Sequence, residues 1–457
     1  MASLRGPGRS GRALTRHTYL YAGLIVAALF APLLSAQAAE LAAGPMPGHS
    51  AMRAVKIWAQ TDEPASVALR YWPYGNEQQA QVTPPVLSSA SSAYAVEIDV
   101  TGLEPGTEYA YRLLIDDEAV APEFEQRFRT QPLWQWRSDP PAFSFALGSC
   151  AYVNQPEYDR PGRPYGSGYQ VFDAIADKQP DFMLWLGDNV YYREADWHSI
   201  SAMYARYSHT RQLPELQRLL SSTHHYATWD DHDYGPNDAD SSYRLREQAK
   251  KIFGDFWPNP EFDSTAGGVT HYFEWHDAAF FVLDNRYFRR ANGRVTGQRT
   301  VLGREQIEWL MDALKSSSAS FKFIVMGGQF LNSAETGENY INLAPGERRD
   351  ILDRIDAEDI PGVLFLSGDR HHSVLMKKEN GVDYPLYEWT VSPLTAGPSS
   401  PRSGEDQYRV AGSLFERRGF GLAEISGPRD DRVLRLGLHD SDGKRVWTTE
   451  IFQRDLR

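Results

Sequence analysis

Apolar and polar positions alternate along the chain from Arg53 to Thr130. The alternating segments are AVKIWAQ, SVALRYWP, YAVEIDV, YAYRLLID and EQRFRT, with the turn signals DEP, PYGN and EPGT between several of them. A period of two places every second side chain on the same face of a strand. Short strands separated by turns at this spacing predict a β-sandwich, which we assign to residues 39–133.

One tyrosine of this region lies in a turn with a specific pattern. The stretch TGLEPGTEYAYRL resembles the Leu-x-Pro-x-Thr-x-Tyr corner of fibronectin type III-like domains. The resemblance implies that the hydroxyl of Tyr109 ties a loop to the sheet. No chemistry is suggested by residues 39–133, so we expect a scaffold or a shield over a neighbouring site.

The pattern changes after the Pro- and Trp-rich linker PLWQWRSDPP. Apolar runs now stop abruptly at small and polar residues, and helix-like stretches such as SGYQVFDAIADKQ and REQIEWLMDALKSS lie between several of them. The runs are FSFALGSC, DFMLWLGDNVYY, HHYATWDDHDYG, AAFFVLDNRYF, KFIVMGGQF and VLFLSGDRHH. This alternation predicts an α/β domain whose strands are buried on both faces. We therefore expect an α/β fold with a β-sheet core flanked by helices over residues 141–424. Strands in residues 425–457 complete it, and the small all-β sandwich precedes it.

The first 38 residues have the organisation of a signal peptide. Several arginines precede an apolar stretch over residues 19–34, and Ala36-Gln37-Ala38 forms a small-x-small cleavage site. No adjacent arginine pair precedes the apolar stretch, which disfavours the twin-arginine export route. We expect a Sec-type leader over residues 1–38, a periplasmic or secreted mature protein, and no stable membrane insertion after cleavage. An uncleaved anchor is the alternative.

The chain is acidic, with a formal net charge of −13, and removal of the basic leader makes it more so. Nucleic-acid binding depends largely on basic side chains that contact phosphates, so nucleic acid is not expected as a specific partner. An anionic small-molecule substrate would need a local reversal of the electrostatic field, and bound cations are the usual means.

Polar side chains follow the apolar runs where each predicted strand ends. Because ligands of open α/β sheets bind beyond the carboxyl ends of the strands, we expect these side chains to converge on one crevice. They are Cys150, Asp188, Tyr191, Asp230, Asp231, His232, Asp284, Gln329, Asp369 and His371.

Each of these residues alone has a plain structural explanation. An aspartate after a strand often only forms a turn, and a single cysteine such as Cys150 is often a small buried apolar residue. Together they indicate metals, because carboxylates, imidazoles and amide oxygens bind divalent cations and a strong cation turns a thiol or phenol into a ligand. The combination predicts a site with two or more metals, in which Asp188 is a bridging carboxylate.

A site with paired metals suits phosphoryl chemistry. Paired cations hold the oxygens of a phosphate group, activate the attacking oxygen and neutralise charge during an in-line displacement. His232, Gln329 and Arg286 could contact the phosphate or the leaving group. Arg286 is equally consistent with a surface cation.

The motifs resemble a known family. The Gly-Asp-x-x-Tyr pattern at 187–191 is similar to that of purple acid phosphatase-type metallophosphatases. The first Asp-x-Gly of that type is replaced by Gly148-Ser149-Cys150, its Gly-Asn-His-Glu/Asp by the segment 229–233 (WDDHD), and its Gly-His-x-His by the segment 368–371 (GDRH). These replacements, in this order, resemble the PhoD-type alkaline phosphatase family.

The resemblance implies a ferric ion (Fe³⁺) and calcium (Ca²⁺). Carried over by motif, the ligands on the iron side are Cys150, Asp188, Tyr191 and Asp369, with Asp188 shared with calcium. The groups on the calcium side, or in contact with phosphate, are Asp231, Asn237 and His371. Members of this family often use the twin-arginine route, so the leader of this chain departs from the pattern.

The sequence thus predicts an exported metal-dependent phosphoesterase of the alkaline phosphatase type. It would hydrolyse small-molecule phosphate mono- or diesters by metal-activated in-line attack, with Asp188, Asp231, His232 and Arg286 as catalytic residues. A phosphodiesterase or phospholipase D-like activity at the same site is the alternative within enzymes. A noncatalytic calcium-binding surface module is the alternative from another class. The Gly- and Ser-rich segment 395–413 is expected to be a mobile surface loop, with a lid as the alternative.

Overall fold

The computed structural model describes residues 38–335, 337–380, 382–405 and 407–457. The predicted leader therefore lies outside the described residues, apart from Ala38. The described chain from Ala39 to Arg457 forms one compact unit. None of its helices combines the length and the apolar character that a membrane span requires.

The region after the leader is an all-β sandwich, as the alternating pattern predicts. One sheet contains β1 (Leu41–Ser50), β2 (Ala54–Thr61) and β6 (Ala95–Thr101). The other is built on β3 (Ser66–Pro73) and β7 (Glu108–Ile115), with the short strands β4 (Gln81–Val82), β5 (Val86–Leu87), β8 (Glu118–Ala119) and β9 (Arg127–Arg129). Ile57, Leu69 and Tyr111 belong to the core that fills the space between them. The backbone N–H of Glu104 donates to the Tyr109 hydroxyl at 3.0 Å, which confirms the predicted corner.

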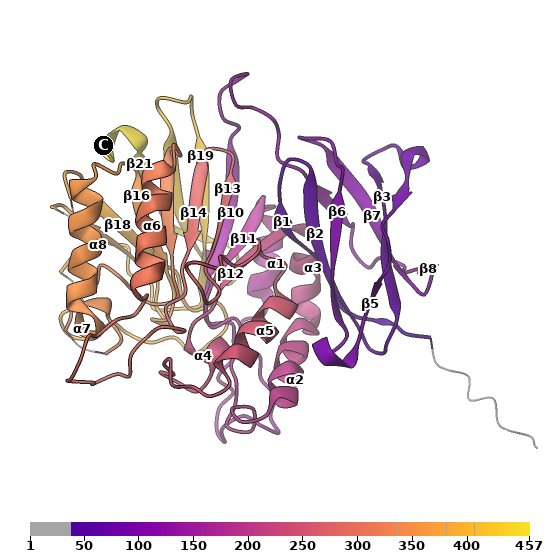
Figure 1. The fold of residues 1–457 in the computed structure, drawn as a ribbon, viewed down its shortest axis with the longest axis horizontal. Helices are drawn as coiled ribbons and strands as arrows, with labels where there is room; N and C mark the ends of the chain where they lie inside the picture. Colours follow the sequence, from indigo (N-terminus) through magenta and orange to yellow (C-terminus); the bar gives the residue numbers. More distant parts are fainter. Residues whose placement is uncertain (1–37, 336, 381, 406) are drawn as a thin grey trace, which may run out of the picture. The chain divides into compact units, whose positions relative to one another are not determined.

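Strand β1 was not predicted, because its sequence LAAGPMPGHS has two prolines and two glycines and no alternation. It forms the edge of its sheet, where proline is tolerated, and its register against β2 shifts repeatedly. It also contacts the α/β region: a Cβ on Gly48 would lie 2.2 Å from the Pro258 carbonyl oxygen, and the Ser50 N–H donates to the Tyr226 hydroxyl at 3.0 Å. Strand β1 therefore connects the sandwich to the α/β region, beside which it lies in Figure 1.

The α/β region contains two six-stranded sheets. In spatial order, the first has β12 (His224–Thr228), β11 (Phe182–Leu186), β10 (Phe143–Gly148), β19 (Gly419–Ser426), β20 (Val433–Asp440) and β21 (Arg445–Phe452). The second has β13 (His271–Trp275), β14 (Ala278–Val282), β15 (Phe321–Val325), β16 (Val363–Ser367), β18 (Leu386–Thr390) and β17 (Val374–Lys378). The strands of residues 425–457 extend the first sheet.

The two sheets share one apolar core. The ring of Phe145 on β10 meets Phe280 on β14 and Phe323 on β15, with ring centroids 5.3 and 5.6 Å apart. Full burial of each such side chain contributes about 1.5–3 kcal/mol to folding. The predicted α/β core flanked by helices is confirmed, but each strand layer is covered on one face by the other sheet. The sequence pattern shows that both faces are buried and does not show what covers each of them.

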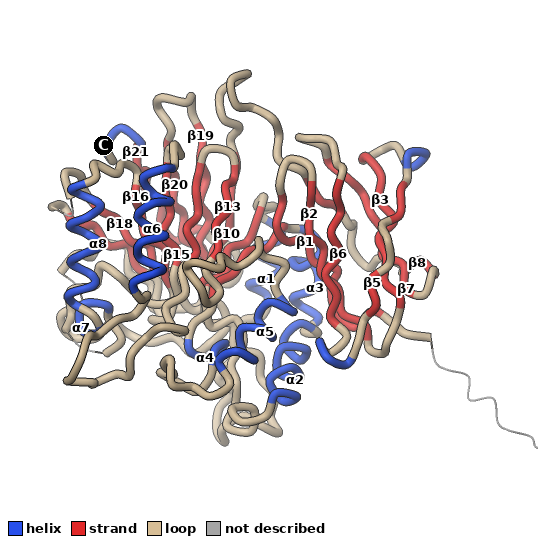
Figure 2. Tube along the Cα trace, viewed as in Figure 1, coloured by secondary structure: helices blue, strands red, loops and turns tan. Residues whose placement is uncertain are grey.

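Helices cover the outer faces of the two sheets, as Figures 1 and 2 show. The helices α1 (Gln170–Asp177), α2 (Ile200–Arg211), α3 (Pro214–Ser222) and α5 (Arg246–Phe256) pack with the outer side chains of β10–β12. The helices α6 (Arg304–Ser316) and α8 (Pro345–Ala357) pack on the second sheet. Two short helices, α4 (Asp231–Tyr234) and α7 (Tyr340–Leu343), lie in the segments that follow β12 and β15.

The carboxyl ends of parallel strands from both sheets meet at one rim. Strands β10, β11 and β12 are parallel, and so are β14, β15, β16 and β18. The Cys150 N–H after β10 donates to the Gly187 carbonyl after β11 at 3.2 Å, and the Gly368 N–H after β16 donates to Gly327 after β15 at 2.7 Å. Residues far apart in sequence are thereby brought to the same place.

Candidate metal centre

A cleft of about 480 Å³ opens at this rim. Six residues that the sequence analysis selected line it: Asp188, Asp231, His232, Asn237, Asp369 and His371. Cys150 and Tyr191 are buried directly beside it. The convergence expected from the strand ends therefore holds for seven of the ten residues, and Asn237, which the family resemblance selected, joins them.

Three sets of side chains could each hold a cation, with ligand atoms within 4.8 Å of one another. The first is Cys150, Asp188 and His371, and the second is Asp188, Asp231 and His232. The third is Asp231, Asp238 and Glu338. Asp188 belongs to the first and second sets, and Asp231 to the second and third, so each set shares a carboxylate with the next.

The first set is tightly connected. The Cys150 Sγ lies 3.6 Å from the Asp188 Oδ2, and the Tyr191 hydroxyl donates to the same oxygen at 3.2 Å. The Tyr191 hydroxyl also lies 3.2 Å from the His371 Nε2. A thiol, a phenol, a carboxylate and an imidazole therefore face one another around a common point.

The tautomer of His371 follows from its surroundings. Its Nδ1 lies 2.6 Å from the Gly397 carbonyl oxygen, which can only accept, and 3.0 Å from the Tyr165 hydroxyl. A proton on Nδ1 satisfies the carbonyl oxygen and leaves the Nε2 lone pair beside the Tyr191 hydroxyl. The resemblance placed His371 on the calcium side, whereas the geometry groups it with Cys150 and Asp188. The Gly397 contact also shows that part of the segment 395–413 helps to build the site.

The cleft disfavours negative charge in the absence of cations. Burial and the neighbouring charges of Asp231 and Cys150 raise the pKa of Asp188 well above its usual value. Burial raises the pKa of the Cys150 thiol to about 12, and burial followed by the Asp188 charge raises the pKa of Tyr191. A bound cation would reverse these shifts, because it stabilises each ionised form. The donor set therefore fits a metal centre.

The three acids of the segment 230–233 (DDHD) have different partners. Asp230 pairs with Arg286 and accepts from the Asn285 amide at 2.9 Å, away from the cleft. The Asp233 carboxylate accepts backbone N–H groups of Asn189, Val190 and Asp230 at 2.9, 3.2 and 3.0 Å. Of the three acids, only Asp231 lines the cleft. Arg286 and backbone amides therefore partner two of the three acids, and Asp231 is the one left facing the space where a cation could bind.

Arg286 is not a surface cation, because its side chain is 1% exposed. It pairs with Asp230 and with Glu338 at 3.1 Å, and its Nη2 lies 3.6 Å from Asp231. Although burial opposes ionisation, the Arg286 charge lowers the pKa of Asp231 below its usual value. Arg286 thus lies behind the cleft wall, and its contact with a phosphate stays a prediction.

Two more residues of the predicted crevice, Asp284 and Gln329, lie outside the cleft, as Asp230 does. Asp284 accepts backbone N–H groups of Val269 and Arg286 at 3.0 and 2.8 Å, as a turn-forming aspartate does. The Gln329 amide donates to the Thr390 hydroxyl at 2.8 Å, and Gln329 does not line the cleft. Asp369 lines the cleft, but its nearest charged partner is Arg370 at 3.5 Å, and none of the three sets of described residues includes it.

Some residues of the cleft were missed by sequence reasoning. They are Tyr165, Asp238, Asn292, Glu338, Arg370 and Arg402. Asp238 directly follows the predicted Asn237, so it could have been included. Glu338 lies in a long segment after β15, where no apolar run ends, so the strand-end rule could not find it.

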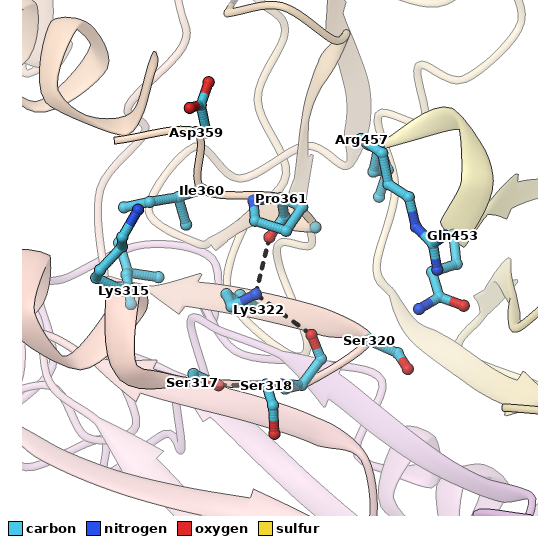
Figure 3. A pocket seen from close by; sticks show the side chains of 14 residues that line it. Lys315, Ser317, Ser318, Ser320, Lys322, Asp359, Ile360, Pro361, Gln453 and Arg457 are labelled. Carbon is cyan, nitrogen blue, oxygen red and sulfur yellow. Dashed lines mark hydrogen bonds between the residues drawn. The ribbon is translucent and has the colours of Figure 1, made fainter. Parts of the chain in front are cut away.

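The opposite end of β15 carries a different cavity, of about 370 Å³ (Figure 3). Lys322 donates there to the carbonyl oxygens of Ala319 and Pro361 at 3.3 and 3.0 Å, and burial lowers its pKa to about 8. Among the described residues, this cavity offers no set of metal-ligating side chains.

Family models match both regions of the chain. The model of the PhoD-like phosphatase family matches residues 145–418, and that of a domain of unknown function matches residues 38–133. Alkaline phosphatase D of Bacillus subtilis (strain 168) is 23% identical over an alignment of 341 residues, and the match covers 63% of this chain and 55% of that protein. The chain thus spans little more than half the length of this curated relative.

Two solved structures share the fold. The structure of PhoD has a TM-score of 0.70 at 17% identity, and the match covers 91% of both chains. Purple acid phosphatase PPD1 from yellow lupin (Lupinus luteus) seeds has a TM-score of 0.64 at 12% identity, covering 89% of this chain and 73% of that one. At these identities the likeness concerns the fold of the backbone.

Proposed function

We propose that this chain, which belongs to the PhoD-like phosphatase family, is an exported metal-dependent phosphoesterase. The proposal names hydrolysis of small-molecule phosphate mono- or diesters as the reaction. Its support is the family match together with the chain of ligand sets in the cleft.

The shared carboxylate is the observation that carries the proposal. Asp188 and Asp231 connect three sets of ligands, each with its ligand atoms within 4.8 Å of one another, in a cleft that Asp369 also lines. Such a concentration of acids would repel a phosphate. When bound, cations would supply the positive charge that attracts phosphate oxygens and the Lewis acidity that promotes attack.

The donors differ in character along the cleft. The thiol of Cys150 and the phenol of Tyr191, with Asp188 and His371, would suit the Fe³⁺ that the family resemblance implies. Asp231, Asp238 and Glu338 offer oxygens only, as Ca²⁺ prefers, and Asn237 lines the same part of the cleft. We therefore propose His371 as a ligand on the iron side.

The chain's own polar groups would orient the substrate. Burial lowers the pKa of His232, so its imidazole is neutral near pH 7 and retains one N–H to donate to a phosphate oxygen. The ring is fixed by Tyr191, with ring centroids 4.2 Å apart. The Asn237 amide can donate from the same wall. Arg286 would act indirectly, by holding Asp230 and Glu338 in place.

Export is proposed from the leader-like pattern of residues 1–38, with the periplasm or the cell exterior as the compartment.

One experiment tests the reaction. Purified protein is analysed for iron and calcium, and turnover of a phosphate monoester is compared with that of the matching diester. We expect bound metal and hydrolysis of at least one ester, both lost after chelation and restored by metal. Preferential cleavage of the diester would select the phosphodiesterase alternative. Metal-dependent stability without any turnover would overturn the proposal in favour of a calcium-binding module.

A further inference from the structure

Arg370 lies between two carboxylates. Its Nη1 is 3.5 Å from the Asp369 Oδ2, and its Nη2 is hydrogen-bonded to the Glu405 Oε1. Asp369 lines the cleft, whereas Glu405 does not. The two acids therefore share one guanidinium, and only one of them faces the substrate.

Glu405 is itself firmly fixed. Its side chain is 1% exposed, and its Oε2 accepts the Arg402 backbone N–H at 2.8 Å. The Asn339 amide approaches Oε1 at 3.5 Å. A buried carboxylate needs such partners, and a charge-assisted bond to arginine is the strongest of them.

The same segment holds the backbone beside Arg370. The Ser399 hydroxyl donates to the Arg370 carbonyl at 2.9 Å, and the Ser399 N–H donates to the His371 carbonyl at 2.8 Å. Together with the Gly397 contact to the His371 ring, these bonds attach residues 397–405 to the segment after β16. We call residues 397–405 the strap.

We infer that Glu405 is a positioning residue of the metal centre: it holds Arg370 so that the Asp369 carboxylate, which lines the cleft and which the family resemblance counts among the ligands, stays available to a cation. This inference rests on the proposed function. Without the Glu405 charge, Asp369 is the nearest remaining acid for the guanidinium, and a cation would have to compete with it. Glu405 acts through Arg370, since it touches neither the cleft nor a ligand set.

The test is a set of variants titrated with Co²⁺ by calorimetry after metal removal. Glu405→Gln keeps the size of the side chain and removes its charge. Arg370→Met combined with Glu405→Gln removes the competing guanidinium as well. Glu388→Gln is the matched control, because Glu388 is also buried and accepts the Phe330 and Leu331 backbone N–H groups, and neither Arg370 nor Asp369 is among its described partners.

We expect Glu405→Gln to weaken Co²⁺ binding by about 10- to 100-fold, the usual effect of losing a group that supports a ligand. The double variant should regain most of the affinity, and Glu388→Gln should bind as the unmodified protein does. Glu405→Asp, which keeps the charge, should lie between the unmodified protein and Glu405→Gln.

Two results would overturn the inference. One is unchanged Co²⁺ affinity in folded Glu405→Gln, with folding judged by the thermal unfolding transition. The other is a Co²⁺ affinity of the double variant that is no higher than that of Glu405→Gln. If the double variant does not fold, the same comparison is made with Glu405→Asp. Failure of the unmodified protein to bind any Co²⁺ would instead refute the metal centre, and the proposed function with it.

Discussion

At the scale of the residue, four residues of the site that follow strands have an unusual backbone conformation. Cys150, Asp188, Asp369 and His371 have φ angles of 60°, 52°, 66° and 56°. A residue with a Cβ in this left-handed region costs of the order of 1–3 kcal/mol, and such residues gather at functional sites. Each of the four follows a strand, so the sharp turn of the backbone aims its side chain toward the common centre.

The role of Asp188 in turnover can be tested without disturbing this backbone conformation. Asparagine is tolerated in the left-handed region and matches aspartate in size, so Asp188→Asn should fold. Because Asp188 belongs to two ligand sets, we expect turnover to fall by about 100-fold or more. Loss of a group that only supports a metal ligand already lowers activity by about 10- to 100-fold. Ester hydrolysis measured alongside the thermal transition checks this.

A control separates the loss of chemistry from the loss of stability. Asp277 is buried and pairs with Arg432 at 2.8 Å, at the amino end of β14. Asp277→Asn should lower the unfolding temperature and leave turnover nearly unchanged. Near-normal activity in Asp188→Asn would remove that carboxylate from the chemistry.

At the scale of the element, the site depends on contact between strand ends of different sheets. Gly368 follows β16 of the second sheet, and a Cβ at this position would lie 2.5 Å from the Ser149 Cβ and 2.6 Å from the Leu186 carbonyl oxygen of the first sheet. Only glycine allows this approach. The distance between the Cys150 and His371 segments is therefore set by a missing side chain.

We expect Gly368→Ala to separate these segments. The added methyl group must displace backbone, at a cost of about 1–3 kcal/mol in unfolding free energy. Metal affinity should fall with it, because Cys150 and His371 belong to the same ligand set. Denaturant unfolding and metal titration of the variant measure the two effects.

Gly346→Ala is the comparison, since nothing lies within 4 Å of its added methyl group in the first turn of α8. Alanine there should raise stability by roughly 0.4–1 kcal/mol. Equal behaviour of the two variants would contradict the role of the Gly368 contact.

At the scale of the whole molecule, the acidic cleft links stability to pH. Burial raises the pKa of Asp369 to about 7, and burial followed by the Glu338 charge raises the pKa of Asp238 to about 7, against a usual value of 3.8. Between about pH 4 and pH 7 the folded protein without metal retains protons that the unfolded chain has lost. The contribution of these two groups to stability is therefore greatest at low pH and falls as pH rises through this window.

Buried histidines such as His224 and His271, whose pKa burial lowers to about 4, act in the opposite direction, so the prediction concerns the pH profile of metal-depleted protein relative to that of metal-loaded protein. The slope is at most about 1.4 kcal/mol per pH unit for each retained proton, and solvent around the exposed Asp238 reduces its share. Bound cations favour the ionised carboxylates, so metal-loaded protein should show a smaller fall. Unfolding midpoints across pH, with and without metal, test this; identical pH profiles of the two forms would contradict it.

Local pattern in the sequence determined much of this protein. Alternation with a period of two identifies the strands of the sandwich, and apolar runs that stop at polar residues identify β10, β11, β12, β14, β15 and β16. Because the carboxyl ends of parallel strands share one rim, the pattern also brings Asp188, Asp231 and His371 together before any coordinates are known. These features depend on neighbours in the chain, which a sequence displays directly.

Only the tertiary structure decided the rest. It paired two sheets face to face, buried Arg286 against Asp230 and Glu338, and attached the strap to His371. It also assigned Asp284 and Gln329 to structural bonds rather than to the cleft. These outcomes depend on contacts between segments distant in the sequence, and such contacts are set by how whole layers pack, which the order of residues within one segment does not specify.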